Sequence, residues 1–510
     1  MTSVTLEIDG ELVTYEKARN KNENFVHEWT WVQATKKLCA TLWENRDAIS
    51  ALTRHHLRLG YQDSCAVVPT EQWSRGSFNV CVPVEVSSAS FRGRVMFRCP
   101  MPHKLAEATY PGTVDEKMGC EVGTYAWMQD WCSDVRIPHL YGFGFADHRH
   151  FTHEEQRPLY IRLVRAFQRY FNRHFGYPTL SRYTLNPTTY RLPTAYMILE
   201  HIDSNMGQLL SHSWDMHRRD PSYRRRLFQG MAHLILSLAR VPQPRIGSYQ
   251  FNNDCTITLT NRPLSCSMMI LENDGAPRTV ERSDTYTCTD AFVTDALSFH
   301  DHYFLSNPNA VIDEGDCRGQ MAVKTLLRAL SHKYIRRECR SGPFVLQFTD
   351  FHASNIFVDK DWNITCLIDL EWVCSLPREM LAVPYWLSGR GIDQLVGEGL
   401  TEFNEIREEF MTILEEQHKA TGELGPSLVG VMGLMWESGG VWFWHCVRSV
   451  NAMLYVFDDH ISPRFLELRP SVEGVLSKFW SENSDEVVES KIADLKLYEN
   501  ELGRLFGERR

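Results

Sequence analysis

Hydrophobic and polar positions divide the chain into a region with strand patterns and a longer region with helix patterns. Between 73 and 99, short runs rich in valine and other β-formers predict strands. In 25–59 and 485–505, apolar residues recur three and four positions apart, which predicts amphipathic helices. We therefore expect the following organisation: an N-terminal helical extension over 1–70, a β-rich lobe over 71–203 with a basic insertion over 146–192, and a mainly helical lobe over 204–510 with a C-terminal helix at 485–506.

Within the β-rich lobe the pattern changes along the chain. Strand-like runs at 78–86 and 94–99 precede helical spacing at 116–131. Extended stretches return at 139–144 and 196–202. Strands, one helix and further strands predict a small mixed sheet that packs against helices, so the expected fold class is α+β.

A basic stretch at 157–191 has seven arginines and no acidic residue. Its first half has helical spacing, with arginines at 162, 165, 169 and 173. Three- and four-residue spacing puts these side chains on one helix face. We favour a solvated or internally paired face over the alternative, which is recognition of an anionic ligand such as a phosphorylated metabolite or RNA.

Composition narrows the functional classes. Hydrophobic residues make up 43% and charged residues 23%, a globular balance, and the net charge of −10 gives no whole-chain reason to bind nucleic acid or a membrane. The 14 cysteines include no CxxC pair, and the N-terminus lacks the apolar core of a secretory signal. We expect reduced thiols, no membrane partner and a cytoplasmic protein.

The segment from 344 to 372 carries the clearest candidate chemistry. An apolar run enters a loop with Asp350, Asn355 follows five residues later, and a second apolar hairpin arm leads to Asp369. Phosphoryl transfer needs a carboxylate that orients the acceptor hydroxyl and takes its proton, and oxygen ligands that hold Mg²⁺ against the nucleotide phosphates. Kinase catalytic loops place a base Asp five residues before a metal-binding Asn and add a second Asp after the next hairpin. Asp and Asn are common in turns, but the apolar arms and Asp369 favour a phosphotransfer site.

The segments Asp350-Phe-His-Ala-Ser-Asn and Ile368-Asp-Leu-Glu-Trp resemble the aminoglycoside phosphotransferase/choline kinase-like superfamily, and the wider chain resembles its fungal branch. Other similar segments follow in the same order, among them Gly76-Ser-Phe-Asn-Val-Cys, Glu121-Val-Gly-Thr-Tyr-Ala-Trp-Met and Ile137-Pro-His-Leu-Tyr-Gly-Phe-Gly. The resemblance spans roughly residues 70 to 470. It implies a bilobal protein-kinase-like fold that binds ATP or another nucleoside triphosphate between its lobes.

The resemblance also implies roles for single residues. Asp350 would be the catalytic base, and Asn355 and Asp369 the metal ligands. The loop over the phosphates would be Gly76, Ser77, Phe78 and Asn79. Glu121 would be the helix carboxylate that pairs with a cation, either Arg98 in place of the usual third-strand lysine or Lys104. Glu200 to Ile202 would be the hinge whose backbone reads an adenine edge.

The expected function is a Mg²⁺-dependent phosphotransferase that moves the γ-phosphoryl group to a hydroxyl of a small metabolite. Two alternatives stay open. Arg98, together with Phe348 where the family usually has histidine, also fits a pseudokinase that binds a ligand or partner. The basic stretch fits a kinase-like enzyme that acts on an RNA or carrier-linked substrate.

Three further features have two interpretations each. For His148, His150 and His153 we favour a solvated loop over a metal site. Glu371 fits a contact with the metal or acceptor as well as a structural ion pair. The aromatic cluster that contains Trp442 is expected to be core, with an acceptor-pocket wall as the alternative.

Overall fold

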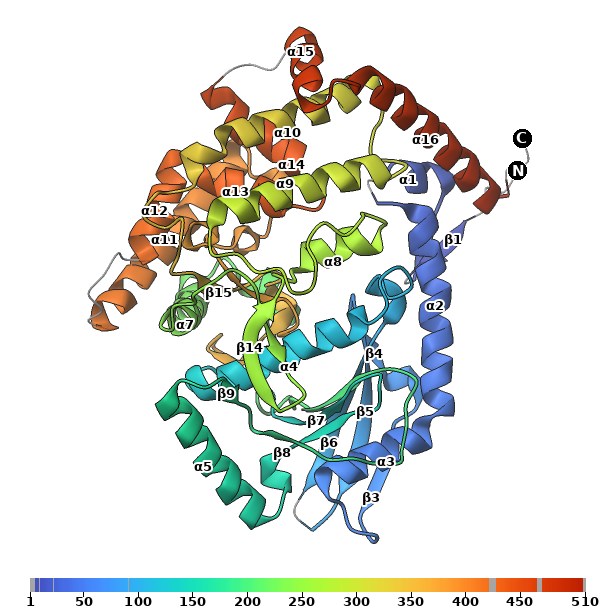
Figure 1. The fold of residues 1–510 in the computed structure, drawn as a ribbon, viewed down its shortest axis with the longest axis vertical. Helices are drawn as coiled ribbons and strands as arrows, with labels where there is room; N and C mark the ends of the chain where they lie inside the picture. The colour runs from blue at the N-terminus through green and yellow to red at the C-terminus, as the bar shows by residue number, and fades with distance from the viewer. Residues whose placement is uncertain are drawn as a thin grey trace.

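The computed structural model describes residues 5–8, 10–21, 23–89, 91–421, 428–465 and 470–507. It is an α+β protein whose large sheet lies in the lower half of Figure 1 and whose long C-terminal helices lie in the upper half. The strands are β1 (Leu6–Ile8), β2 (Glu11–Val13), β3 (Ser64–Val67), β4 (Ser74–Arg75), β5 (Asn79–Ser87), β6 (Arg92–Pro100), β7 (Leu140–Gly144), β8 (His150–His153), β9 (Thr179–Leu180), β10 (Tyr183–Leu185), β11 (Tyr196–Glu200), β12 (Gln208–Leu209), β13 (Ser248–Phe251), β14 (Thr256–Asn261), β15 (Val345–Phe348), β16 (Ile356–Val358), β17 (Ile364–Leu367) and β18 (Val373–Leu376).

The α-helices are α1 (Tyr15–Arg19), α2 (Phe25–Glu44), α3 (Arg46–Leu57), α4 (Thr113–Trp131), α5 (Leu159–Phe175), α6 (Leu210–His217), α7 (Pro221–Ala239), α8 (Cys266–Asn273), α9 (Thr289–Ser306), α10 (Glu314–Tyr334), α11 (Gly397–Thr421), α12 (Leu428–Ser438), α13 (Gly440–Arg448), α14 (Met453–Val456), α15 (Pro470–Trp480) and α16 (Ser484–Leu505). Short 3₁₀ turns include η3 (Glu154–Gln156), η4 (Ala353–Asn355) and η6 (Tyr385–Ser388). None of these described helices has both the length and the apolar character needed to cross a membrane.

The main sheet has eight strands in the order β10-β8-β7-β11-β6-β5-β3, with β4 paired to β5. Each pairing among these strands is antiparallel, so the expectation of a mixed sheet is wrong. The reason is connection length. A short loop such as the one between β5 and β6 can only reverse the chain, whereas parallel neighbours need a crossover of about a dozen residues or more.

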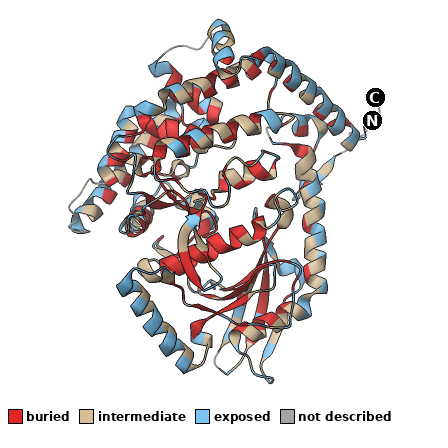
Figure 2. Ribbon diagram, viewed as in Figure 1, coloured by how far each residue is buried: buried red, intermediate tan, exposed pale blue. Residues whose placement is uncertain are grey.

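Different helices pack against the two faces of the main sheet. The buried valines of β5, such as Val82 and Val84, share a core with Leu42, Ile49 and Leu52 of α2 and α3. On the other side lies α4, in which each residue from Glu116 to Met128 is buried, as the red helix in Figure 2 shows. The segment 1–70 is therefore not only helical, because β3 pairs with β5 and α3 covers the sheet.

The two ends of the chain pack together. Phe25 at the start of α2 shares a small core with Tyr498 and Phe506, which lie on and just after α16. The Tyr498 hydroxyl also accepts a hydrogen bond from the Phe25 backbone N–H at 3.2 Å. Figure 1 shows both termini at the same edge of the molecule. The helix predicted at 485–506 matches α16, and its apolar side faces the N-terminal segment.

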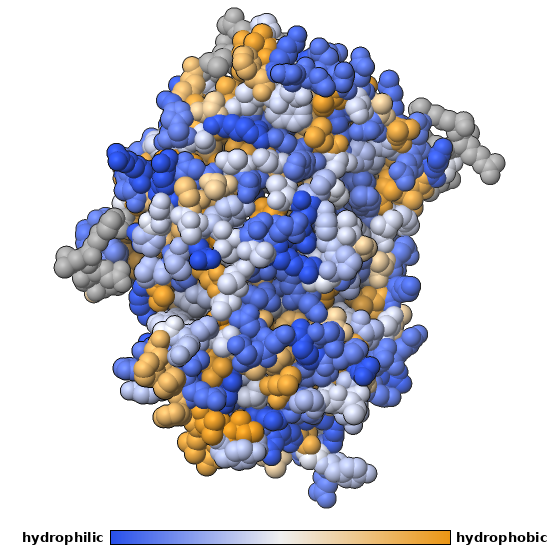
Figure 3. Space-filling model, in the orientation of Figure 1, coloured by the Kyte–Doolittle hydropathy of each residue, from blue (hydrophilic) through white to orange (hydrophobic). Residues whose placement is uncertain are grey.

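The basic stretch forms α5, β9 and β10. Arg165 donates to the carbonyl oxygens of Ser181 and Tyr183, each at 2.8 Å, and Arg169 pairs with Glu154. This part of the arginine face is therefore paired within the protein, as we favoured. The opposite face of α5 is apolar and exposed, and it forms part of the orange surface at the lower left of Figure 3.

Candidate active site

The loop with Asp350 is held by two short antiparallel pairings. β15, which precedes the loop, pairs with β18, and the hairpin β16–β17 follows η4. The hairpin turns the chain back, so the Ile368 N–H donates to the Asn355 carbonyl oxygen at 3.0 Å. Asp369 therefore lies beside the loop that carries Asn355, although 14 positions separate them in the sequence.

Asn355 is buried and has a defined orientation. Its side-chain NH₂ group donates to the Asp350 carbonyl oxygen at 2.8 Å. Because the amide nitrogen makes this bond, Oδ1 is the atom that Asn355 can offer to a cation. The five-residue spacing thus lets Asn355 hold the loop that carries Asp350 and present an oxygen at the same time.

Asp369 has left-handed backbone geometry, with φ at 65°. Asp and Asn enter this region more readily than other residues with side chains. The Asp369 Oδ1 atom accepts from Arg98 at 2.5 Å. Burial raises the pKa of Asp369 to about 7, although Arg98 opposes this rise.

Arg98 joins three carboxylates from two other parts of the chain. From β6, its guanidinium contacts Glu121 on α4 at 2.5 Å and Asp369 at 2.5 Å, and lies 3.3 Å from Glu371. The other cation that we considered, Lys104, instead lies over the Trp31 ring, 6.0 Å from its centroid. Of these two cations, Arg98 is therefore the one that pairs with Glu121.

Lys117, which the sequence analysis missed, completes this buried cluster. Its ammonium is 2.9 Å from Glu121, one helical turn along α4, and it also pairs with Glu371. Burial alone would raise the pKa of Glu371, but Lys117 and Arg98 lower it to about 2. Glu371 is thus a structural ion-pair partner. The i to i+4 spacing from Glu121 was the one sequence signal for Lys117.

The expected phosphate loop divides into an exposed and a buried half. Gly76 and Ser77 are exposed in the turn between β4 and β5. Phe78 is buried against Trp372, with ring centroids 4.9 Å apart. The Asn79 side chain is also buried, and donates to Glu371 at 2.8 Å. The side chains of Phe78 and Asn79 therefore hold the turn from inside and cannot reach a ligand above it.

The expected hinge begins at the end of β11. The Glu200 carboxylate pairs with Arg136 at 2.8 Å, and the Glu200 N–H donates to the His139 carbonyl oxygen at 2.8 Å. These bonds occupy the Glu200 N–H, so this group cannot read an adenine edge. Ile202 follows in a half-buried segment without regular structure.

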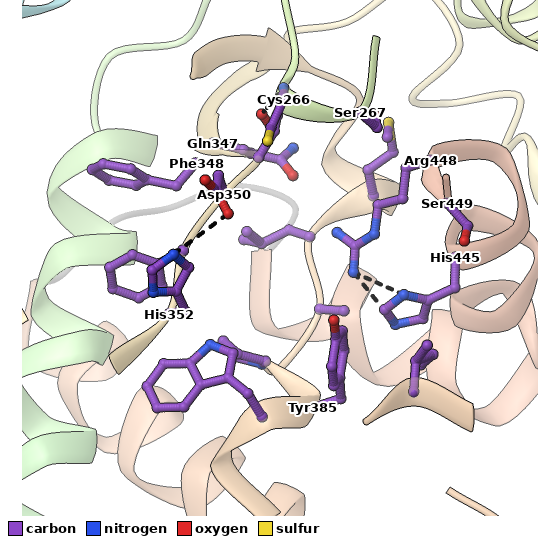
Figure 4. Close-up of a pocket in the computed structure, with 18 of the residues that line it drawn as sticks. Cys266, Ser267, Gln347, Phe348, Asp350, His352, Tyr385, His445, Arg448 and Ser449 are labelled. Atoms are coloured by element: carbon purple, nitrogen blue, oxygen red, sulfur yellow. Dashed lines mark hydrogen bonds and ion pairs between the residues drawn. The ribbon is translucent and has the colours of Figure 1, made fainter. Parts of the chain in front are cut away.

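A cavity of about 420 Å³ opens beside Asp350 (Figure 4). Its wall comes from the Asp350 loop, α7, α8, α13 and the segment around Tyr385. His352 lies 3.7 Å from Asp350, and its ring also accepts from the Ser354 N–H, which fixes the loop. Burial raises the pKa of Asp350, and His352 opposes this effect. Phe348 lines the same cavity, 5.2 Å from the Phe351 ring.

Two of the three histidines near residue 150 do not lie in a solvated loop, whereas His148 lies in the partly exposed connection before β8. His150 and His153 are buried on β8, so that interpretation is wrong for these two. His150 bonds the Tyr196 hydroxyl at 2.9 Å. His153 instead lies with His139 and Glu155, whose candidate ligand atoms are all within 4.8 Å of one another. The sheet, through β7 and β8, brings these residues together.

No protein-family model and no curated protein matches the chain. The resemblance of the sequence motifs to the aminoglycoside phosphotransferase/choline kinase-like superfamily thus stays a prediction.

Proposed function

We propose that the protein is a bilobal, protein-kinase-like phosphotransferase that uses Mg²⁺. It would move the γ-phosphoryl group of ATP or another nucleoside triphosphate to a hydroxyl of a small metabolite. One observation carries the proposal: Arg98 on β6 contacts both Glu121 on α4 and Asp369 after the hairpin. Kinases need a strand cation paired with a helix carboxylate, next to the metal-binding Asp.

The donor atoms suit the metal. The Asn355 Oδ1 atom and the Asp369 carboxylate are hard oxygen ligands, which Mg²⁺ prefers. When bound, Mg²⁺ would neutralise charge on the nucleotide phosphates. Arg98 and Lys117 keep Glu121 and Glu371 paired, so these carboxylates hold the frame of the site.

Asp350 has the role of base in this proposal. Its carboxylate orients the acceptor hydroxyl in the cavity and takes the hydroxyl proton as the oxygen bonds to the γ-phosphorus. The bond from that phosphorus to the bridging oxygen breaks, and the nucleoside diphosphate leaves. A pKa raised by burial makes Asp350 a stronger base than an exposed carboxylate.

The test is the isosteric variant Asp350→Asn. With γ-labelled ATP and a protein-free metabolite extract as the acceptor source, we expect a loss of label transfer of about 10²–10⁴-fold. Calorimetry should show that Mg²⁺-ATP still binds this variant. Asp361→Asn is the matched control, because Asp361 lies at the exposed turn of the β16–β17 hairpin and should keep full activity. Full transfer activity in Asp350→Asn would refute the assignment.

A second candidate function is a pseudokinase that senses or binds a ligand without transferring phosphate. It is favoured by the contact of Arg98 with Asp369, because the same carboxylate would have to bind the metal. Calorimetry with millimolar ATP, with and without Mg²⁺, separates the two candidates. Absence of any nucleotide binding favours the pseudokinase, and binding that depends on Mg²⁺ favours the phosphotransferase.

A further inference from the structure

Arg448 at the end of α13 lies in the wall of the cavity beside Asp350. In Figure 4 the guanidinium of Arg448 points into the cavity, with His445 on its own side and Asp350 across from it. One of its terminal nitrogens lies 3.0 Å from Nδ1 and 3.4 Å from Nε2 of the His445 ring, and because a neutral imidazole has a single acceptor nitrogen, the ring accepts one hydrogen bond from it. Across the described parts of the chain, no carboxylate forms an ion pair with Arg448.

His445 does not supply the missing negative charge. Burial, helped by the neighbouring Arg448, holds the pKa of His445 well below its ordinary value, so the ring is neutral. Burial also lowers the pKa of Arg448, since water is partly excluded from its charge. A guanidinium in such a place is normally paired with an anion or a polar network. The anion that would complete this site is not part of the described protein.

The rest of the wall indicates what else the ligand carries. Aromatic and aliphatic side chains such as Phe351, Trp386 and Leu234 form most of the wall, and Asp350 is the one carboxylate among its described residues. This wall suits a molecule with an apolar body and one anionic group. It does not suit a molecule with several positive charges, which would need several carboxylates.

Building on the proposed function, we propose that the acceptor is an anionic hydroxy compound, a carboxylate or a phosphate ester, whose anion binds Arg448 while its hydroxyl faces Asp350. The planar guanidinium can donate two parallel hydrogen bonds to either anion. Arg448 is thus a specificity-determining residue, and Asp350 remains the base.

Binding of matched small molecules to the full chain tests this proposal without any need for turnover. The probes are hydroxyaryl and ω-hydroxyalkyl carboxylates of graded length, their primary amides, and the corresponding phosphate esters. By calorimetry and thermal shift, acids or esters should bind the wild type more tightly than amides. Arg448→Gln should weaken the binding of the anionic probes about ten- to hundredfold and leave the binding of the amides unchanged, as expected for a lost charge-assisted hydrogen bond.

Control variants distinguish a specific loss of anion binding from a general loss of folding. Arg448→Gln should keep or raise the melting temperature without ligand, because it removes an unpaired charge and can still bond His445. Arg225→Gln, exposed on α7, should bind anions like the wild type. Equal binding of acids and amides, or anion binding that survives Arg448→Gln, would overturn the proposal. If anion binding depends on Arg448 but no phosphoryl transfer is found, the proposed function fails and the anion site stands.

A second inference concerns α5. An ordinary surface helix packs its apolar face against the protein, but α5 exposes its apolar face and packs an arginine-containing face against the protein. Its apolar residues occupy one continuous side and are exposed: Leu159, Tyr160, Leu163, Val164, Phe167, Tyr170, Phe171 and Phe175. Phe167 is 69% exposed and Tyr170 is 71% exposed. A contiguous apolar side of this length is normally covered in the functional state of a protein. On α5 the half-buried side that faces the protein instead contains Arg165 and Arg169.

We infer that α5 lies in the interface of an anionic lipid membrane. Arg162 and Arg173 are exposed along the border of the apolar face, and the whole stretch 157–191 has no acidic residue. A helix with leucine and aromatic side chains on one face and arginines beside it fits a lipid surface. Two copies of α5 packed face to face would bring the like charges of Arg162 and Arg173 together. The helix also lies at the outer edge of the molecule, where a flat surface can reach it (Figure 1).

This inference departs from the expectation that the protein has no membrane partner, and it concerns surface binding without a spanning helix. Co-sedimentation with phosphatidylcholine vesicles, with and without phosphatidylserine, is the test. We expect binding to the anionic vesicles that Phe167→Glu abolishes and Phe479→Glu leaves unchanged, since Phe479 is an exposed apolar residue on α15. Failure to bind anionic vesicles, or a wild-type dimer in light scattering that Phe167→Glu dissociates, would refute it.

Discussion

The Arg98 guanidinium and the Asp369 carboxylate meet at 2.5 Å although 271 positions separate them in the chain. The contact joins the strand region to the loop region, and Glu121 on α4 shares the same guanidinium. Three carboxylates and two cations thus meet at one place, with Lys117 as the second cation, and of these five side chains only that of Asp369 is partly exposed. Under the proposed function, the stability of the fold and phosphoryl transfer would depend on the same side chains.

Loss of Arg98 should therefore affect both stability and nucleotide binding. Arg98→Met leaves Glu121, Asp369 and Glu371 with Lys117 as their nearest cation, and we expect the free energy of unfolding to fall by about 3–5 kcal/mol. Urea unfolding followed by circular dichroism measures this change. Arg94→Met is the control, since the exposed pair of Arg94 with Glu85 on neighbouring strands should contribute less than about 1 kcal/mol. Equal effects of the two variants would contradict the assigned role.

Removal of the Asn355 side chain should raise the Mg²⁺ concentration that ATP binding requires. Asn355→Ala loses the hydrogen bond to the Asp350 carbonyl and, under the proposed function, one oxygen ligand of Mg²⁺. We expect the Mg²⁺ concentration for half-maximal ATP binding to rise about tenfold or more. Calorimetric titrations at several Mg²⁺ concentrations give this value. Asn363→Ala, in the turn of the same hairpin, should not change it, because the Asn363 side chain donates to Asp359 within that turn.

Replacement of the buried Lys324 by methionine should give a gain in stability that depends on pH. This lysine is buried on α10, and burial lowers its pKa to about 8, although Asp301 opposes the shift. In the unfolded chain Lys324 keeps its proton up to its ordinary pKa of 10.5. Burial of the protonated lysine therefore lowers the free energy of unfolding by its full amount below pH 8. This destabilisation decreases as the pH rises from about 8 to about 10.5. Lys324→Met should raise the free energy of unfolding at pH 7 by about 1–3 kcal/mol, an amount limited by the lost contact with the Phe304 ring.

Denaturant unfolding between pH 7 and pH 10 tests this sign. The gain from Lys324→Met should shrink steadily above pH 8. Lys478→Met, at an exposed position of α15, should give a small effect that does not change over the same range. A gain that grows with pH would contradict the assignment.

Substitution of alanine for two helical glycines should change the stability of the protein in opposite directions. A Cβ atom at Gly123 on α4 would lie 2.9 Å from the Tyr249 backbone oxygen on β13, which cannot move without shifting the strand. Gly123→Ala should therefore destabilise the protein by about 1–3 kcal/mol. A Cβ at Gly433 on α12 has no atom within 4 Å, so Gly433→Ala should stabilise by up to about 1 kcal/mol. Thermal unfolding of both variants checks the pair, and stabilisation by Gly123→Ala would show that α4 and β13 pack less closely.

The sequence by itself determined features that local chemistry controls. Valine-rich alternation sets β5, apolar spacing sets α16, and the order of Asp350, Asn355 and Asp369 around a hairpin is a matter of adjacent turns and strands. These patterns are local because side-chain period and turn geometry depend on neighbours in the chain.

Tertiary structure alone decided which distant groups meet and which face of an element is buried. The sequence allowed either Arg98 or Lys104 as the partner of Glu121, and packing of β6 on α4 selected Arg98. It showed that the arginines of α5 share a face, but the packing of α5 on β9 and η3 decided that Arg165 and Arg169 of this face turn toward the protein. Arg448 had no sequence signal, because its unpaired charge matters only once α13 places it in the same cavity as Asp350. Periodicity records that an element has two faces, and only the rest of the fold determines which face is covered and by what.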